Sequence, residues 1–235
     1  MSRFYPAQPA WAATAVVNAV WVGAGESPEW IATNLDALVG QLGDMLGIAR
    51  WRTSKGKPWE GSPEVLADLI RSHVATDDRG QPEPESGYVC TVMGRGGPRA
   101  EVDVRISAGA IAPGRRLPRH RLNIVMRQAA MGGVNSETAD TLCAAVVETW
   151  RPATVVLSDR SVLRLASRGN WKIGVGYRLW LSAAVGAVSQ LAEGLTAVSL
   201  GGGTLVSAPD EWPAERVVEA MTQTLAANDL DEIPH

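Results

Sequence analysis

Residues that could take part in catalysis are scattered along this chain. The three histidines, His73, His120 and His235, belong to a helix end, a basic loop and the final position. That spacing predicts neither a catalytic triad nor a metal site. Cys90 and Cys143 stand alone in apolar patterns, which favours buried free thiols and a reducing compartment. The sequence therefore predicts no catalytic residues and no metal or other cofactor, and we expect the protein not to be an enzyme.

The glycine run Gly201-Gly202-Gly203, followed by Thr204, is the stretch closest in composition to a phosphate-binding loop. A phosphate site of that kind needs a helix N-terminus directly after the glycines. The residues that follow favour a strand, so a tight hairpin turn is the better interpretation. One alternative stays open, namely a small-ligand-binding module or an enzyme with a pocket near Trp180 and the Gly201-Gly203 turn.

The composition is that of a globular protein rich in tryptophan. Its 235 residues are enough to bury a substantial core without disulfides or metals, and they include nine Trp, three Tyr and one Phe. Trp combines a large apolar ring with an N–H donor and therefore suits cores and binding surfaces alike. A net charge of −3 and a pI of about 5.7 give no support to nucleic-acid binding.

The charge is spread unevenly along the chain. Residues 95–127 carry eight arginines against Glu101 and Asp103, a net charge of +6, whereas residues 208–235 have a net charge of −6. The two segments either solvate opposite faces or neutralise each other, and whether the basic segment has a partner of its own stays open. The basic loop at 113–121 has no interleaved aromatic residues to stack on bases, so we expect no direct contact with nucleic acid.

Residues 10–22, preceded by Arg3, have part of the composition of a signal sequence. Pro6, Pro9 and Asn18 interrupt the stretch, its flank is not basic, and its residues alternate as in a strand. No run of about 18 apolar residues occurs, so the sequence predicts no membrane partner or span. We therefore expect a cytoplasmic protein.

Local patterns predict the elements of the first half. In Ser27-Pro28-Glu29 a capping residue precedes a first-turn proline and an acid, which predicts a helix that ends at Gly47. Ser62-Pro63-Glu64 repeats this signal for a second helix. We also expect strands at 13–23 and 48–53, an exposed acidic linker at 76–86, and a hairpin at 87–94 and 100–107 with Val102, Val104 and Ile106 facing inward.

In the second half, Ser136 is predicted to cap a helix that ends at Trp150. Alternation from Asn170 to Ser182 predicts a strand with Val175, Tyr177, Leu179 and Leu181 on one side. The remaining predicted elements are strands at 122–126, 153–158, 196–200 and 204–207 and helices at 161–167 and 214–227.

These elements do not alternate strictly between strand and helix, which predicts an α+β fold. We expect a single domain over residues 1–235 with a mixed, largely antiparallel sheet packed by several helices. The acidic linker at 76–86 is the candidate seam between domains, and the tail at 228–235 is expected to fray.

The order of these pieces resembles the immunity protein 52 family of bacterial polymorphic toxin systems over nearly the whole chain. The family's Gly-Trp-x-x-Tyr-Leu-Ser pattern occurs at residues 176–182 with its aromatics exchanged, Tyr177 standing for Trp and Trp180 for Tyr. Both positions stay large and aromatic, so their packing can be retained. The motif residues that carry the resemblance are Trp150, Arg151, Pro152, Gly176, Tyr177, Trp180, Leu181, Gly202, Gly203 and Thr204.

The resemblance implies an immunity protein, an antidote encoded beside a secreted toxin that often has a restriction-endonuclease-like nuclease domain. Such an antidote binds its cognate toxin and blocks the active or substrate-binding surface. A nuclease site is electropositive because it binds phosphates, so an acidic face would steer the antidote toward it.

Two groups of residues are candidates for this contact. An exposed Trp59 or Trp212 would anchor it, although both are equally suited to cover the core. The acids are Asp77, Asp78, Glu83 and Glu85 on the linker and Asp210, Glu211, Asp229, Asp231 and Glu232 near the end.

Overall fold

An antiparallel sheet of nine strands forms the centre of the molecule. The computed structural model describes residues 8–235, so Arg3 and Pro6 lie outside the described residues. The strand order is β2-β3-β4-β5-β1-β6-β7-β9-β8, and each neighbouring pair is antiparallel. The strands are β1 (Thr14–Val20), β2 (Trp51–Thr53), β3 (Tyr88–Gly94), β4 (Ala100–Ala108), β5 (Arg121–Gln128), β6 (Thr154–Ser158), β7 (Arg178–Ser182), β8 (Thr196–Leu200) and β9 (Gly203–Ser207).

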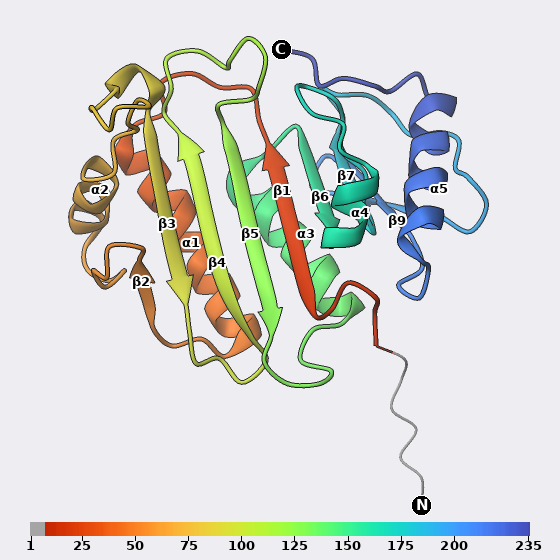
Figure 1. Ribbon diagram of the computed structural model, residues 1–235, viewed down its shortest axis with the longest axis horizontal. Coiled ribbons are helices and arrows are strands. Elements are labelled where there is room, and N and C mark those ends of the chain that lie inside the picture. Colours follow the sequence, from red (N-terminus) through yellow and green to blue (C-terminus); the bar gives the residue numbers. More distant parts are fainter. Residues whose placement is uncertain (1–7) are drawn as a thin grey trace, which may run out of the picture.

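Five α-helices cover this sheet unevenly. They are α1 (Pro28–Leu46), α2 (Pro63–Arg71), α3 (Ser136–Trp150), α4 (Arg160–Leu165) and α5 (Ala214–Ala227). Helices α1 and α3 lie behind the sheet in Figure 1, whereas α4 lies in front of it near β6 and β7, and α5 packs against α4. The front of β3, β4 and β5 carries no helix, whereas β1 is contacted by α4 (Figure 1). This is an α+β fold in a single-domain arrangement, as predicted.

The hairpin of β3 and β4 shows how the sequence produces one covered and one open face. Val102, Val104 and Ile106 are fully buried toward the helices, whereas Asp103 is partly exposed on the open face and Arg105 is exposed there. Alternate residues of a strand point to opposite faces, so the apolar pattern requires a covered back and permits an open front.

The ends of α1 follow the predicted capping chemistry, whereas Ser62 at the start of α2 makes no side-chain capping bond and the cap of α3 differs. The Ser27 hydroxyl accepts a hydrogen bond from the Trp30 N–H at 3.2 Å, and Gly47 ends α1 with a φ of 71°. For α3 the cap is Asn135 rather than Ser136. The Asn135 side chain and Thr138 bond reciprocally in a capping box, which leaves Ser136 as the first helical residue.

The predicted strand at 170–182 is shorter in the structure, where β7 begins only at Arg178. The segment before it is irregular, although Trp171, Ile173 and Val175 are buried. At Gly176 the chain passes so close to β6 that a Cβ would lie 2.1 Å from the Leu157 carbonyl oxygen. That approach explains why the position holds glycine.

The C-terminal tail was expected to fray, but its last residues are bound to this irregular segment. Ile233 is buried, and its N–H donates to the Trp171 carbonyl at 2.8 Å. Asp231 pairs with Arg168 and Lys172. These partners lie more than fifty residues away along the chain, so no local pattern could predict them.

The acidic linker at 76–86 connects α2 to β3 within one continuous sheet. Strand β2 precedes the linker and β3 follows it, and the two strands pair directly. The linker contains a short 3-10 turn, Pro84–Ser86, and an isolated antiparallel bridge between Thr76 and Pro82. It is therefore a surface loop that begins and ends on the same sheet.

The basic and acidic segments do not neutralise each other. Arg95 and Arg127 pair with Asp103 on the open face of the sheet, inside the basic segment itself. Burial alone would raise the pKa of Asp103, but these arginines hold the pKa below its usual value. The acids of the C-terminal segment pair instead with Arg168, Lys172 and Arg178.

Candidate functional site

The two tryptophans expected to anchor a partner are not exposed, so that expectation is wrong. Trp59 is 5% exposed and donates its indole N–H to Asp36 at 3.1 Å. Trp212 is 6% exposed, and the guanidinium of Arg216 lies 3.9 Å from its ring centroid. Both rings complete the core, so neither is available for a contact without rearrangement.

Asp210 is also an interior residue rather than a free acid. It accepts hydrogen bonds from the Trp11 indole at 2.9 Å, from Arg178 at 2.9 Å and from Ser136. Burial alone would raise the pKa of Asp210, but the hydrogen bonds from Ser136 and Arg178 lower it. Arg178 is 4% exposed and also binds Asp140, so this ion cluster joins α3, β7 and the β9–α5 connection.

The four linker acids, in contrast, are exposed. The Asp77 carboxylate accepts hydrogen bonds from the backbone N–H groups of Arg79 and Gln81, at 2.9 and 2.8 Å. Asp77 therefore fixes the turn that presents Asp78 to solvent. The Glu83 carboxylate accepts a hydrogen bond from the Ser86 hydroxyl at the other end of the linker.

A groove of about 880 Å³ separates this linker from the basic loop at 113–121. Its floor is the end of the open sheet face, where Val89, Ser107 and Arg121 lie side by side across β3, β4 and β5. Glu83 and Glu85 line the linker side of what we call the linker groove. The other side is formed by residues 111–119.

Four arginines line the linker groove, at positions 115, 116, 119 and 121. All four are exposed, and within residues 8–235 none of them has a carboxylate within ion-pair distance. Glu83 and Glu85 face the same groove but do not pair with them. The groove therefore has one acidic wall and one basic wall.

Two large apolar residues stand at the rim among these charges. Ile111 is 61% exposed and Leu117 is 55% exposed. Interface cores are enriched in apolar residues and arginine. The charge pattern of the sequence identifies the loop as basic, whereas the signal that marks it as a contact surface is the pair of apolar residues within it.

The basic loop is anchored at both ends. At its start the Gly25 N–H donates to the Ala110 carbonyl at 2.7 Å, and the Ile111 N–H donates to the Glu85 carbonyl at 3.0 Å. At its end His120 is fully buried, with its Nε2 3.1 Å from a carboxylate oxygen of Glu26. These contacts fix the loop relative to the linker.

Glu26 is the centre of this anchor. Its carboxylate accepts hydrogen bonds from the Trp21 indole at 3.0 Å and from the Gly109 N–H at 2.9 Å, in addition to its contact with His120. Burial alone would raise the pKa of Glu26, but the contacts with His120, Trp21 and Gly109 outweigh it and lower the pKa to about 2. Glu26 is therefore ionised at neutral pH.

A second hollow of about 340 Å³ lies on the other side of the basic loop. Leu117, Pro118 and Arg121 line both hollows, and Leu163 of α4 and Ile233 of the tail line the second. The basic loop thus projects between two concave regions at one end of the open sheet face.

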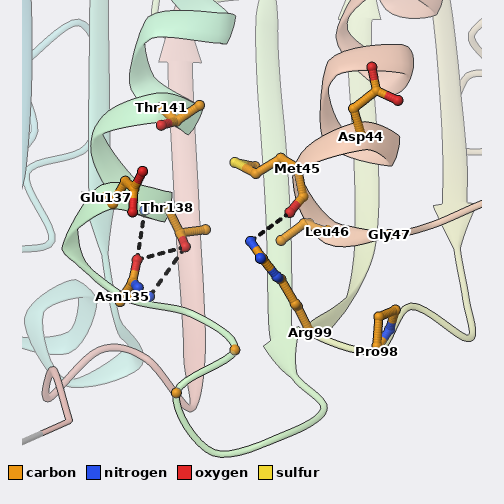
Figure 2. Close-up of a pocket in the computed structure, with 12 residues that line it drawn as sticks. Asp44, Met45, Leu46, Gly47, Pro98, Arg99, Asn135, Glu137, Thr138 and Thr141 are labelled. Carbon is orange, nitrogen blue, oxygen red and sulfur yellow. Dashed lines mark hydrogen bonds between the residues drawn. The ribbon is translucent and has the colours of Figure 1, made fainter. Parts of the chain in front are cut away.

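Figure 2 shows a different pocket, of about 590 Å³, between the end of α1 and the start of α3. Arg99 reaches across to the last turn of α1 and donates to the Met45 carbonyl at 3.1 Å (Figure 2). Asp44 and Glu137 stand on opposite sides. Since Arg99 is bonded to the helix end and Asn135 caps α3, the main polar groups of this pocket stabilise the two helix ends.

The expected pocket near Trp180 and the Gly201-Gly203 turn is occupied by the protein itself. Trp180 is buried, and its indole donates to the Leu200 carbonyl at 2.8 Å. A Cβ on Gly203 would lie 2.7 Å from the Trp180 ring, so the turn packs directly on the indole. A hollow of about 460 Å³ lies beside this hairpin and is lined by Leu200 and Leu205 together with Arg178, but its lining includes neither Trp180 nor the Gly201-Gly203 turn.

The motif residues of the family resemblance are structural in the same way. Trp150 and Tyr177 are buried, and the Tyr177 hydroxyl donates to the Trp212 carbonyl at 3.0 Å. Leu181 is buried as well, and its carbonyl lies 2.2 Å from where a Cβ on Gly203 would be. The motif therefore builds the β6–β7–β9 half of the sheet.

Both cysteines are free and buried, as predicted, and burial raises the pKa of each thiol to about 12. Across residues 8–235 there is no group of three or more His, Cys, Asp or Glu side chains arranged to hold a metal ion. Among the helices of that range, none is long and apolar enough to span a membrane.

Within the predicted C-terminal acidic group, Glu211 lies far from the linker acids. The linker adjoins β3, whereas Glu211 follows β9, and five strands lie between β3 and β9. Strands are spaced about 4.8 Å apart, so Glu211 is separated from the linker by roughly 29 Å across the sheet. Asp231 and Glu232, in contrast, directly precede Ile233, which lines the second hollow together with Leu117 and Arg121. The structure thus brings the linker acids together with the basic loop rather than with the C-terminal acids.

Comparisons with known proteins find similarity among solved structures. No protein-family model matches the chain, and no curated protein matches it. Among solved structures, the Pseudomonas aeruginosa T6SS protein PA0821 is similar with a TM-score of 0.49 and 10% sequence identity, covering 92% of this chain and 72% of that chain. A match at this level carries no functional argument, and the resemblance to the immunity protein 52 family stays a prediction.

Proposed function

We propose that this protein is a cytoplasmic antidote that binds a cognate toxin and blocks its active or substrate-binding surface. The toxin proposed from the family resemblance is a nuclease. The contact surface is the linker groove with its rim, on the open side of the sheet. The observation that carries the proposal is that the exposed acids Glu83 and Glu85 line one groove with the exposed Ile111 and Leu117.

This surface has the physical properties that a blocking protein needs. Asp77 holds the acidic turn in one conformation, so little conformational entropy is lost when a partner binds. Exposed acids accelerate the encounter with an electropositive nuclease site. The apolar side chains at the rim offer surface that a bound partner would bury, and this burial contributes affinity that charges alone do not provide.

Co-expression with the product of the neighbouring gene tests the proposal. We expect the wild-type chain to restore growth and the purified proteins to bind each other. A double variant, Asp78→Lys with Glu85→Lys, should lower the affinity at least tenfold, because both acids are exposed and have no side-chain partner within residues 8–235.

The matched control is Glu148→Lys, a charge reversal on the exposed side of α3, behind the sheet. It should leave affinity unchanged. Absence of binding between the wild-type chain and the neighbouring gene product would contradict the proposal. Equal loss of affinity in the control and the double variant would contradict the placement of the surface.

A further inference from the structure

We propose that the basic wall of the linker groove binds an acidic, partly apolar segment of the protein partner. This inference rests on the proposed function, since it names the chemistry that the partner presents to the groove. It concerns the arginines at 115, 116, 119 and 121, to which no role has been assigned above.

The groove arginines differ from Arg95 and Arg127 on the same sheet face, although Arg105 on that face is also exposed and has no carboxylate partner among residues 8–235. Arg95 and Arg127 are neutralised by Asp103, with 2.6 Å between Arg127 and the carboxylate. The four groove arginines have no such partner among the described residues, although Glu83 and Glu85 line the opposite wall. An arginine fork binds a carboxylate through two parallel hydrogen bonds, so the wall offers several sites for acidic side chains.

The apolar residues of the same loop favour a peptide over a simple anion. Leu117 lies between Arg116 and Arg119 in the sequence and is exposed, and Ile111 stands at the start of the wall. The floor adds Val89 beside Ser107. A segment with alternating acidic and apolar side chains would use both features, whereas phosphate would use only the charges.

Nucleic acid fits this groove poorly. No aromatic residue lines it, so nothing can stack on a base. Glu83 and Glu85 form the opposite wall and would repel a phosphate backbone that followed the arginines. The lining therefore favours a protein segment with carboxylates on one side.

The basic wall is rigid enough to select such a segment. The Arg119 N–H donates to the Pro113 carbonyl at 2.9 Å, which closes the loop on itself. Gly114 has a φ of 103°, and a Cβ there would lie 2.1 Å from the Leu117 carbonyl oxygen. Together with the anchor at His120, this geometry fixes the backbone that carries the arginines before binding.

A groove with opposite charges on its two walls also fixes the orientation of the partner. A basic group of the partner must face Glu83 and Glu85 while its acidic segment faces the arginines. The reverse orientation places like charges together, which is costly. The groove therefore favours a partner surface whose basic and acidic regions are arranged to face its acidic and basic walls, respectively.

A binding assay with defined peptides tests this inference without the toxin. The probe is a fluorescein-labelled peptide in which pairs of Glu alternate with pairs of Leu. The control peptide has Gln in place of each Glu. We expect fluorescence anisotropy to show tighter binding of the Glu peptide. Arg115→Gln with Arg116→Gln should weaken that binding about tenfold, and raising the ionic strength should weaken it further.

Arg50→Gln is the matched control, because Arg50 is exposed and unpaired in the described part of the chain but lies before β2, outside the groove. It should bind the Glu peptide as the wild type does. Equal binding of the Glu and Gln peptides, or an unaffected double variant, would overturn the inference. Stronger binding of polyphosphate or a single-stranded oligonucleotide than of the Glu peptide would also overturn it, by assigning the wall to phosphate.

The peptide assay and the growth assay fail independently. Peptide binding without protection from the toxin would contradict the antidote proposal and leave the acidic-segment inference standing. Protection without peptide binding would contradict the inference alone. Circular dichroism spectra and melting temperatures that match the wild type will establish that the variants fold, as expected for exposed arginines.

Discussion

Single residues decide how firmly the candidate surface is held. Glu26 follows β1 and precedes α1, yet its carboxylate contacts Gly109 and His120, which flank the basic loop. Trp21 supplies a third contact from the end of β1. One buried carboxylate thus ties three segments of the chain together, and its ionisation contributes to their stability.

Glu26→Gln should reduce stability and change its dependence on pH. The folded pKa of Glu26 is lowered from 4.5 to about 2. Its contribution is therefore fully present above pH 4.5 and is lost as the pH falls toward 2. We expect the free energy of unfolding of the variant to be about 3 kcal/mol lower than that of the wild type at neutral pH. As the pH falls from 4.5 toward 2, this free energy should decline less steeply in the variant.

Urea unfolding at several pH values measures both effects. The control is Glu148→Gln, which removes an exposed acid from α3 and should leave the curve unchanged. A Glu26→Gln variant whose stability declines with acid as steeply as the wild type would contradict the assignment.

At the scale of elements, glycines mark where two parts of the backbone meet. In the turn between β8 and β9, Gly202 has a φ of 79°, and Gly203 lies against the Leu181 carbonyl and the Trp180 ring. Gly40 lies on the exposed side of α1, with nothing within 4 Å of an added Cβ. The first pair is required by geometry, whereas Gly40 weakens its helix.

Alanine substitutions at Gly203 and Gly40 should therefore have opposite effects. Gly203→Ala places a Cβ 2.2 Å from the Leu181 carbonyl oxygen and should destabilise the protein by about 3 kcal/mol. Gly40→Ala should stabilise it by about 1 kcal/mol. The melting temperatures of the two variants, each compared with the wild type, test both expectations. A Gly203→Ala protein as stable as the wild type would show that the turn does not pack as described.

At the scale of the whole molecule, the C-terminal tail closes the side of the sheet that carries α4 and α5. Ile233 is 2% exposed, and Trp171 stacks on His235 with ring centroids 4.1 Å apart. The Ile173 N–H donates to the Asp231 carbonyl at 2.9 Å. The tail thus supports the irregular segment before β7 and one wall of the second hollow.

Ile233→Ala should destabilise the protein by about 3 kcal/mol, since it leaves a cavity beneath the tail. Leu165→Ala truncates a side chain that is 51% exposed and should lower the free energy of unfolding by less than about 1 kcal/mol. Chemical denaturation of both variants provides the comparison. Similar small losses at the two sites would mean that the tail contributes little to the core.

The sequence by itself determined the elements whose signals are local. Alternation placed Val102, Val104 and Ile106 on the covered face of β4, and Ser27 with Gly47 marked the ends of α1. Such features depend on backbone dihedral preferences and on which side of an element is apolar, and both are written in neighbouring residues.

Only the tertiary structure decided which segments meet. Trp59 and Trp212 are buried, and Asp210 is enclosed by Trp11, Ser136 and Arg178, because the strand order brings distant segments together. The linker groove arises in the same way, from β3, β4 and β5 ending beside one another. Pairing between strands joins residues that are remote in sequence. The sequence therefore shows the acidic linker and the basic loop as separate segments, but it does not show that they face each other across one groove.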